Sequence, residues 1–300
     1  MSDTLTLDSH ITEVTHLIPA IAAWKRFLDD QGRSLHTIKA FSADLQLLCE
    51  YLPTDKTIGA VSTDDLNGFV DWLEKGRAKP CSPKSLSRRI TSIKSFFGWL
   101  TRFGVLSISP AEKVLQRSVI SPLPAILSPL EVEQVYEAAS KLRNGNQPDA
   151  RAYCLFGMLL ETGIKKGECR AVYLSHLDLA DPQNASVFIR YSSPALRLKE
   201  RKIKLSPAWV EAFTEYLQQY KVEDRVFNWS PRRLEYILED LGVEAGLRKH
   251  LSFDMCRWTS VLQDWKSGVD HDTIRQKLGI SKIQWREVSL KLNQLAEKSG

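Results

Sequence analysis

Apolar residues recur every three to four positions through most of the first 115 residues, the spacing that places them on one face of a helix. The third such segment opens with Ser62-Thr63-Asp64-Asp65, which resembles a helix cap. The fourth opens with Ser82-Pro83, a serine cap followed by proline at the first helical position. Amphipathic helices with aromatic residues pack as a bundle. The pattern therefore predicts a four-helix bundle over residues 14–30, 35–52, 62–73 and 82–103.

The pattern changes at Ser118–Ser128, which contains two prolines and little helical period, and which we interpret as an interdomain linker. A capping box, Ser128-Pro129-Leu130-Glu131, then opens a new domain. The period shortens in SVFIRY (186–191) and KERKIKL (199–205), which predict a basic hairpin around the turn SSPAL. The remaining apolar segments predict helices and complete an α+β domain, over residues 129–142, 149–161, 206–220, 231–246, 254–267, 270–278 and 281–297. The predicted organisation is a helical domain at 1–117, a linker at 118–128 and an α+β domain at 129–300.

The composition is that of an ordinary globular chain, with 300 residues, 43% apolar and 26% charged. No apolar run is long enough to span a bilayer, and the N-terminus shows no signal peptide. The five cysteines are odd in number and form no CxxC pair. This usage is typical of a reducing cytoplasm and predicts neither a metal site nor a cofactor.

Positive charge is concentrated in two stretches, although the net charge is only +5. Eight basic residues and no acid fall between Lys75 and Ala111. Six basic residues and only Glu200 fall between Arg190 and Lys204. Surfaces of this kind can neutralise nucleic-acid phosphates. The alternative, a solvated basic face without a partner, stays open for each stretch.

Several segments, in order and at the expected spacing, resemble the tyrosine recombinases of phage integrase and Xer type. The resemblance runs from about residue 14 to 290 and implies a SAM-like helical core-binding domain followed by a catalytic domain. It rests on the core-binding helices, the domain opening, the segment of the first catalytic arginine, the hairpin of the catalytic lysine, and the His-x-x-Arg helix with its Leu-Gly turn. These are residues 34–52 and 82–114, LPAILSPLEVEQV (123–135), LLETGIKKGE (159–168), LKERKIKLS (198–206) and Asp254–Gly279.

Members of that family cut DNA with a tyrosine, assisted by two arginines, a lysine and further hydrogen-bond donors. Matched residue by residue, this chain keeps Glu168, Lys199 and Arg257 but departs from the pattern at several other positions. The first arginine is Lys165, which loses the two-pronged grip of a guanidinium on phosphate. The histidine positions are occupied by Asp254, Trp258 and Ile280, and the nucleophile position is occupied by Ser289.

Ser289 is a poor substitute for the tyrosine. Its hydroxyl falls short by roughly 4 Å, and an alkoxide leaves less readily than a phenoxide, whose parent pKa is about 10. No tyrosine follows Tyr236, which precedes Arg257 and so lies on the wrong side of the motif. The degenerate site predicts that strand cleavage is lost.

The resemblance and the charge placement together indicate a non-cleaving DNA-binding protein that acts in, or regulates, recombination or integration of a mobile element. Two alternatives stay open: an active recombinase with an unusual nucleophile, and a protein-interaction module without DNA binding. The C-terminal apolar stripe through Trp285, Val288, Leu292 and Leu295 packs either on its own domain or on a second copy or an active recombinase. The residues expected to contact duplex DNA are Lys84, Arg88, Arg89, Lys165, Lys199, Arg201, Lys202 and Arg257.

Overall fold

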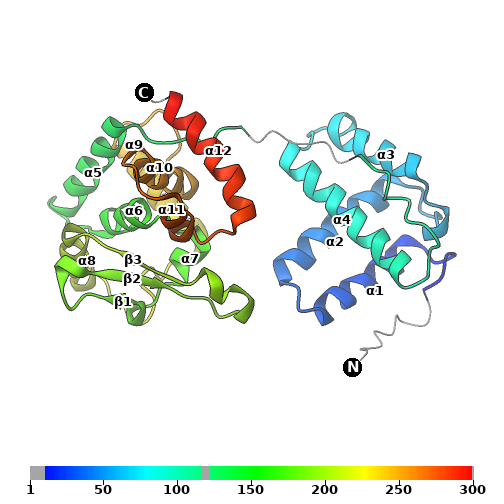
Figure 1. Cartoon of the computed structure of the whole chain (residues 1–300), viewed down its shortest axis with the longest axis horizontal. Coiled ribbons are helices and arrows are strands. Elements are labelled where there is room, and N and C mark those ends of the chain that lie inside the picture. Colours follow the sequence, from blue (N-terminus) through cyan, green and yellow to red (C-terminus); the bar gives the residue numbers. More distant parts are fainter. Residues whose placement is uncertain (1–10, 116–121, 299–300) are drawn as a thin grey trace. The chain divides into compact units, whose positions relative to one another are not determined.

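The computed structural model describes residues 11–115 and 122–298, and these form two compact units that meet in sequence at Pro122 and Leu123 (Figure 1). The division falls inside the predicted linker, of which residues 118–121 lie outside the described part. The second half of that segment belongs to the second unit. Leu127 is buried, and its amide donates to the Thr259 hydroxyl at 2.9 Å. Residues 123–128 therefore pack as an ordered arm, because their apolar side chains have a core to enter.

The first unit is the predicted helical bundle. Serine caps begin three of its helices: the hydroxyls of Ser34, Ser62 and Ser82 accept hydrogen bonds from backbone amides three residues later. The first helix begins three residues later than predicted, because the backbone of His16 pairs with Thr57 in an isolated bridge. A π-helical turn at Trp72–Gly76 follows the third helix. The four helices are α1 (Leu17–Asp30), α2 (Leu35–Tyr51), α3 (Thr63–Asp71) and α4 (Pro83–Arg102).

Aromatic side chains fill the centre of this bundle. Trp24 is fully buried; it stacks on Phe41 with ring centroids 5.9 Å apart and meets Phe96 edge-on at 5.5 Å. These rings join α1, α2 and α4 into one core.

The second unit surrounds a central apolar helix. α6 (Arg151–Thr162) buries nine of its twelve residues and lies among α5 (Pro129–Arg143), α8 (Pro207–Gln219), α9 (Pro231–Glu244) and α10 (Phe253–Lys266). A small antiparallel sheet lies along one edge of the unit (Figure 1). Its strands are β1 (Leu177–Asp178), β2 (Ser186–Ile189) and β3 (Arg201–Lys204), with Ser186 opposite Lys204 and Ile189 opposite Arg201. The α+β prediction for this unit is confirmed.

The structure differs from the prediction where elements are short. Neither β1 nor α7 (Lys166–Arg170) was predicted. The expected turn between β2 and β3 contains a 3-10 helix, Pro194–Lys199, so Lys199 lies on this turn and not on a strand.

The C-terminal helices pack on their own unit. α11 (His271–Leu278) and α12 (Lys282–Lys298) close a separate apolar cluster with α10. Leu292 and Leu295 are buried there, while Trp285 and Val288 are partly buried against it. The apolar stripe of the last helix is thus used within its own unit. Within residues 11–115 and 122–298, no helix combines the length and apolar character needed to cross a membrane.

Candidate nucleic-acid interface

A tight turn after α6 positions the first site residue. Gly163 ends the helix at φ +60°, and a Cβ atom there would lie 3.3 Å from the Ser260 hydroxyl oxygen. A glycine therefore fits this turn best. The chain then reaches Lys165, the residue just before α7, whose side chain is only partly exposed.

The buried side chain of Glu168 stabilises this turn. Its carboxylate is 3% exposed and accepts from the Lys165 amide at 2.8 Å, from the Tyr191 hydroxyl, and from the Arg201 guanidinium at 2.9 and 3.1 Å. Arg201 also donates to the Lys277 carbonyl at 2.7 Å. Burial alone would raise the pKa of Glu168, but the hydrogen bonds and charge of Arg201 outweigh it, and the pKa lies below its usual value. This ion pair joins α7, β3 and α11.

Arg201 was expected to contact DNA, but its side chain is only 8% exposed and its donors serve Glu168 and two backbone carbonyls. Its position gives it a structural task, namely to hold the hairpin against α7 and α11.

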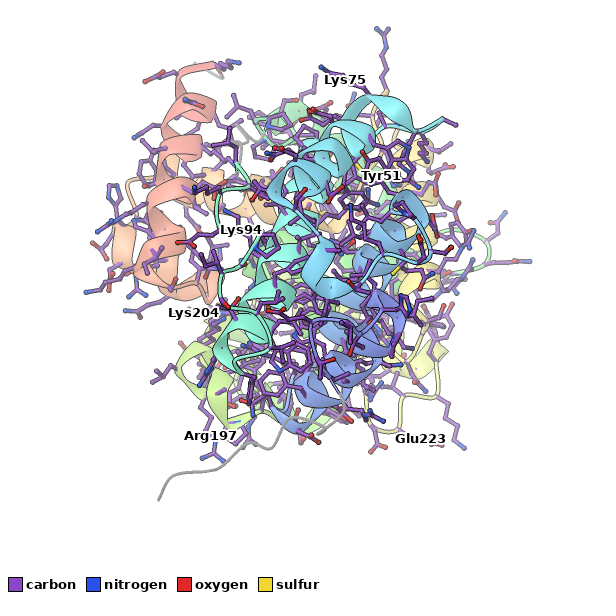
Figure 2. All side chains as sticks on the ribbon, turned by 90° about the vertical axis from the view of Figure 1, so that its right-hand side faces the viewer. Tyr51, Lys75, Lys94, Arg197, Lys204 and Glu223 are labelled. Atoms are coloured by element: carbon purple, nitrogen blue, oxygen red, sulfur yellow. The ribbon has the colours of Figure 1, made fainter. Side chains whose placement is uncertain are left out.

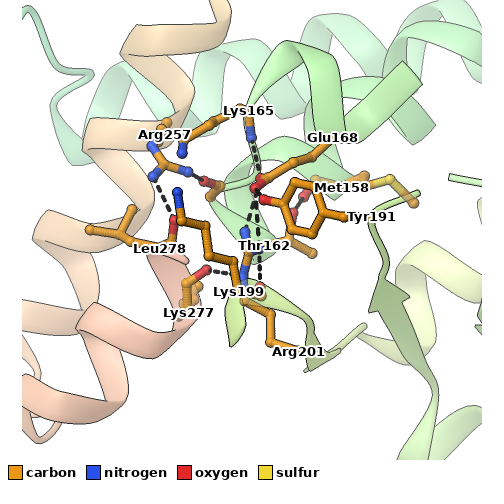
Figure 3. Close-up of polar contacts among 11 residues, drawn as sticks. Met158, Thr162, Lys165, Glu168, Tyr191, Lys199, Arg201, Arg257, Lys277 and Leu278 are labelled. Atoms are coloured by element: carbon orange, nitrogen blue, oxygen red, sulfur yellow. Dashed lines mark hydrogen bonds and ion pairs between the residues drawn. The ribbon is translucent and has the colours of Figure 1, made fainter. Parts of the chain in front are cut away.

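Three cationic side chains come together next to this ion pair. Figure 3 shows the charged ends of Lys165, Lys199 and Arg257 pointing toward one another. Arg257 is fixed by hydrogen bonds to two backbone carbonyls, those of Gly163 and, at 2.8 Å, Leu278. Within the described residues, none of the three cations forms an ion pair with a carboxylate. We refer to Lys165, Lys199 and Arg257 as the cation cluster.

The electrostatics of the cation cluster favour an anion. Burial is the largest cause of the lowered pKa of Lys165, and the positive charges of Arg257 and Lys199 lower it further. The negative charge of Glu168 acts in the opposite direction. Burial likewise lowers the pKa of Arg257. Both groups therefore carry positive charge that is partly withdrawn from water, and a phosphate placed between the cations would stabilise it.

A cavity of about 820 Å³ opens beside the cation cluster. Its lining includes Lys165 and Arg257, and also Asp254, Arg232 and Tyr236. Asp254 is exposed, so a carboxylate stands at the place where the family pattern has a histidine. Tyr236 receives a hydrogen bond from the Arg232 Nε at 2.6 Å. Sequence order set Tyr236 apart from the motif, whereas the structure brings it to the same cavity as Arg257.

The last two motif positions lie on the C-terminal elements. Ile280 packs against the apolar cluster of α10–α12. Ser289 lies in the middle of α12, and its hydroxyl donates to the Arg286 carbonyl of its own helix at 3.2 Å. No hydrogen bond of the described residues links Ser289 to the cation cluster.

In the first unit, the predicted contacts Lys84, Arg88 and Arg89 differ in their surroundings. Lys84 is exposed in the first turn of α4. Arg88 and Arg89 both pair with Asp44 of α2, at 2.5 and 3.4 Å, and that carboxylate is 2% exposed. The stretch between Lys75 and Ala111 has no acid of its own, but the fold supplies one from a neighbouring helix. Two of the expected DNA contacts are therefore occupied in holding α4 to α2.

The sheet presents the remaining basic residues outward. Lys202 pairs with Asp178 across to β1 at 2.9 Å, and both side chains are exposed. Lys204 and Arg197 are exposed, and Figure 2 shows Arg197 pointing away from the ribbon of the hairpin turn. No cluster of His, Cys, Asp and Glu side chains suited to a metal ion occurs in the described ranges.

Two family profiles match this chain, and together they cover both units. Residues 21–104 match the profile described as "Phage integrase, N-terminal SAM-like domain", and residues 126–286 match "Phage integrase family". The chain belongs to the phage integrase family. The match to the second profile ends at residue 286, so it does not include Ser289.

Relatives of this integrase-family chain include tyrosine recombinases that align over most of their length. Tyrosine recombinase XerC of Roseiflexus sp. (strain RS-1) is 25% identical over 91% of this chain and 89% of its own. Tyrosine recombinase XerD of Listeria innocua serovar 6a is 23% identical, covering 90% of this chain and 92% of its own.

Solved structures confirm the fold. XerH bound to its difH substrate in a pre-cleavage complex aligns with 98% of both chains at a TM-score of 0.73 and 15% identity. A lambda integrase dimer bound to a COC′ core site aligns with 91% of this chain and 77% of the integrase chain, at a TM-score of 0.69 and 13% identity. The tyrosine recombinase fold predicted from the sequence is therefore shown.

Proposed function

We propose that this integrase-family chain binds duplex DNA through the cation cluster without cleaving it. In this role it acts in DNA recombination of a mobile element, as an accessory or competitor of an active recombinase. The observation that carries the proposal is the convergence of Lys165, Lys199 and Arg257 without a carboxylate partner among the described residues. Relatives named as tyrosine recombinases and neighbours solved on DNA support the choice of duplex DNA as the anion.

The geometry suits holding a phosphate better than cutting it. Arg257 is oriented by two carbonyls, so its guanidinium is fixed before any ligand arrives, and the turn at Gly163 sets the backbone of Lys165 close to it. Lys165 offers a point charge where a guanidinium would offer a fork. Asp254 adds negative charge at the cavity, which opposes the further charge that develops during phosphoryl transfer. Ser289 directs its hydroxyl to its own helix.

A second copy or an active recombinase would meet the outer face of α12. Its inner stripe is already used within the unit, while Ile283 and Leu290 are 78% and 64% exposed. Association with a second copy would place two cation clusters on one DNA site.

The test is fluorescence anisotropy with a duplex from the protein's own flanking genomic sequence, titrated between about 50 and 200 mM salt. We expect Lys165→Ala and Lys199→Ala each to weaken binding on the order of tenfold and to reduce the salt slope by about 1. Lys221→Ala is the matched control, because it removes an exposed lysine of the same unit that lies outside the hairpin and the cavity and already pairs with Glu223. Binding by the wild type that does not depend on salt, or equal losses in all three variants, would refute the proposal.

One observation favours a second candidate, an active recombinase that uses Tyr236. Its phenol lies at the cavity shared with Lys165 and Arg257 and accepts a hydrogen bond from Arg232. In such a step the phenolic oxygen would lose its proton and bond to phosphorus, while the bond between phosphorus and the 5′ oxygen breaks and that oxygen takes up a proton. A covalent adduct on nicked DNA that disappears in Tyr236→Phe and persists in Ser289→Ala would establish this candidate.

A further inference from the structure

A second cavity, of about 520 Å³, also borders α7 and shares no lining residue with the first. Lys166 lines the first cavity, whereas Gly167 and Arg170 line the second. Three arginines, a histidine and two tyrosines line this second cavity, namely Arg170, Arg190, Arg225, His176, Tyr173 and Tyr191. No acidic side chain is among its lining residues. It is thus a basic pocket separate from the cation cluster.

The three arginines of this pocket keep their charges unneutralised. Arg190 lies over the Phe188 ring at 5.6 Å, and Arg225 lies over the Tyr173 ring at 5.6 Å. Stacking orients a guanidinium plane but leaves its N–H donors free. The Nε of Arg170 is buried without a hydrogen-bond partner. Within residues 11–115 and 122–298, none of these three arginines forms an ion pair with a carboxylate.

His176 adds a neutral donor. Its Nδ1 accepts the Tyr173 amide at 3.4 Å, which leaves the proton of the neutral ring on Nε2. Burial first, and then the charge of Arg190, lower the pKa of His176, while Glu200 opposes them. Arg170 and Arg225 also line the pocket around it. At neutral pH the arginines and His176 thus present donors, and the cavity has no carboxylate to compete with an anion.

We infer that this pocket binds a phosphate group. Guanidinium forks match the oxygens of a phosphate, and the cavity volume is in the range of small-ligand sites. The group comes either from the backbone of a bound duplex or from a free phosphate compound such as a nucleotide. The duplex source rests on the proposed function, and the free source does not.

The first measurement needs no variant. Inorganic pyrophosphate is added to the full chain at constant ionic strength, and the heat of binding is recorded together with the proton NMR titration of His176. An anion among the arginines raises the pH at which His176 takes up its proton, because it counters the charge of Arg190. Absence of binding heat, or a His176 titration that pyrophosphate leaves unmoved, would overturn the inference.

Variants then identify the site and the source. Arg190→Gln with Arg225→Gln is expected to weaken pyrophosphate binding on the order of tenfold or more, whereas Arg248→Gln, an exposed arginine of the same unit outside the pocket, leaves it unchanged. Equal pyrophosphate affinity in the double variant and the control would contradict the assignment. Duplex titrations give the source: a salt slope reduced by about 2 indicates backbone phosphate, and an unchanged slope indicates a free compound. Failure of the wild type to bind duplex would sink the proposed function and leave the pyrophosphate result standing.

Discussion

Replacing Arg201 by methionine should destabilise the second unit strongly. The pair that it breaks is buried, with Glu168 and Arg201 side chains 3% and 8% exposed and their closest atoms 2.9 Å apart. Removing one partner of a buried pair leaves an uncompensated charge and costs about 3–5 kcal/mol. The neighbouring Lys202 provides the control, because its pair with Asp178 has the same 2.9 Å distance but side chains 62% and 58% exposed. Lys202→Met should therefore cost only about 0–1 kcal/mol.

The pH dependence gives this prediction a second signature. The folded-state pKa of Glu168 lies below its unfolded value, so the pair's contribution is present above the unfolded pKa, about 4.3, and is lost as pH falls through the folded value. In Arg201→Met the buried carboxylate loses its main partner, and burial then favours its protonated form. The difference in the free energy of unfolding between variant and wild type should be largest at neutral pH and should become smaller as the pH falls.

Hydrogen–deuterium exchange of the β2 and β3 amides measures the opening free energy of this unit without interference from the first. Urea denaturation followed by circular dichroism gives an independent value. The reasoning that the Glu168–Arg201 pair holds the site together would be refuted if Arg201→Met lost no more stability than Lys202→Met. It would also be refuted if the loss of stability in Arg201→Met did not change with pH.

Three further outcomes follow from the structure. Asp44→Ala should destabilise the first unit by about 1–3 kcal/mol in chemical denaturation, because two arginines and the Ser92 hydroxyl lose their carboxylate partner, whereas Asp30→Ala at an exposed position should change little. Lys165→Arg should strengthen duplex binding in the anisotropy titration and still yield no covalent adduct, since it restores only the phosphate fork; weaker binding would contradict the placement of this residue at phosphate. Three cysteines should resist a thiol reagent in the native protein, because each is buried and burial raises the pKa of each thiol; fast reaction of more than two thiols would contradict the packing at Cys154, Cys169 and Cys256.

The sequence predicted the long elements because their signals are local. Serine caps and a 3.6-residue period occur within single segments, so the four helices of the first unit and the larger helices of the second were foreseeable. β1 has two residues and α7 has five, which is too short for a period to appear. The ordered arm at Leu127 depends on Thr259, a contact that no local pattern reveals.

The site was predictable only in part, because charge partners come from distant segments. The sequence pointed to Lys165, Lys199 and Arg257, and the structure brings them together. It also assigned Arg88 and Arg201 to DNA, but their partners Asp44 and Glu168 lie far away in the chain.

The basic pocket shows the same limit. Arg170, Arg190 and Arg225 belong to three separate segments, and only folding shows that they share a cavity without an acid.

The claim that this chain binds DNA but does not cut it is tested most directly with nicked suicide DNA carrying the protein's flanking genomic sequence. A denaturing gel reports a covalent adduct, and a native gel of the same mixture reports binding. The account predicts a shifted band on the native gel and no adduct on the denaturing gel. A covalent adduct would contradict it, and Tyr236→Phe beside Ser289→Ala would then identify the nucleophile.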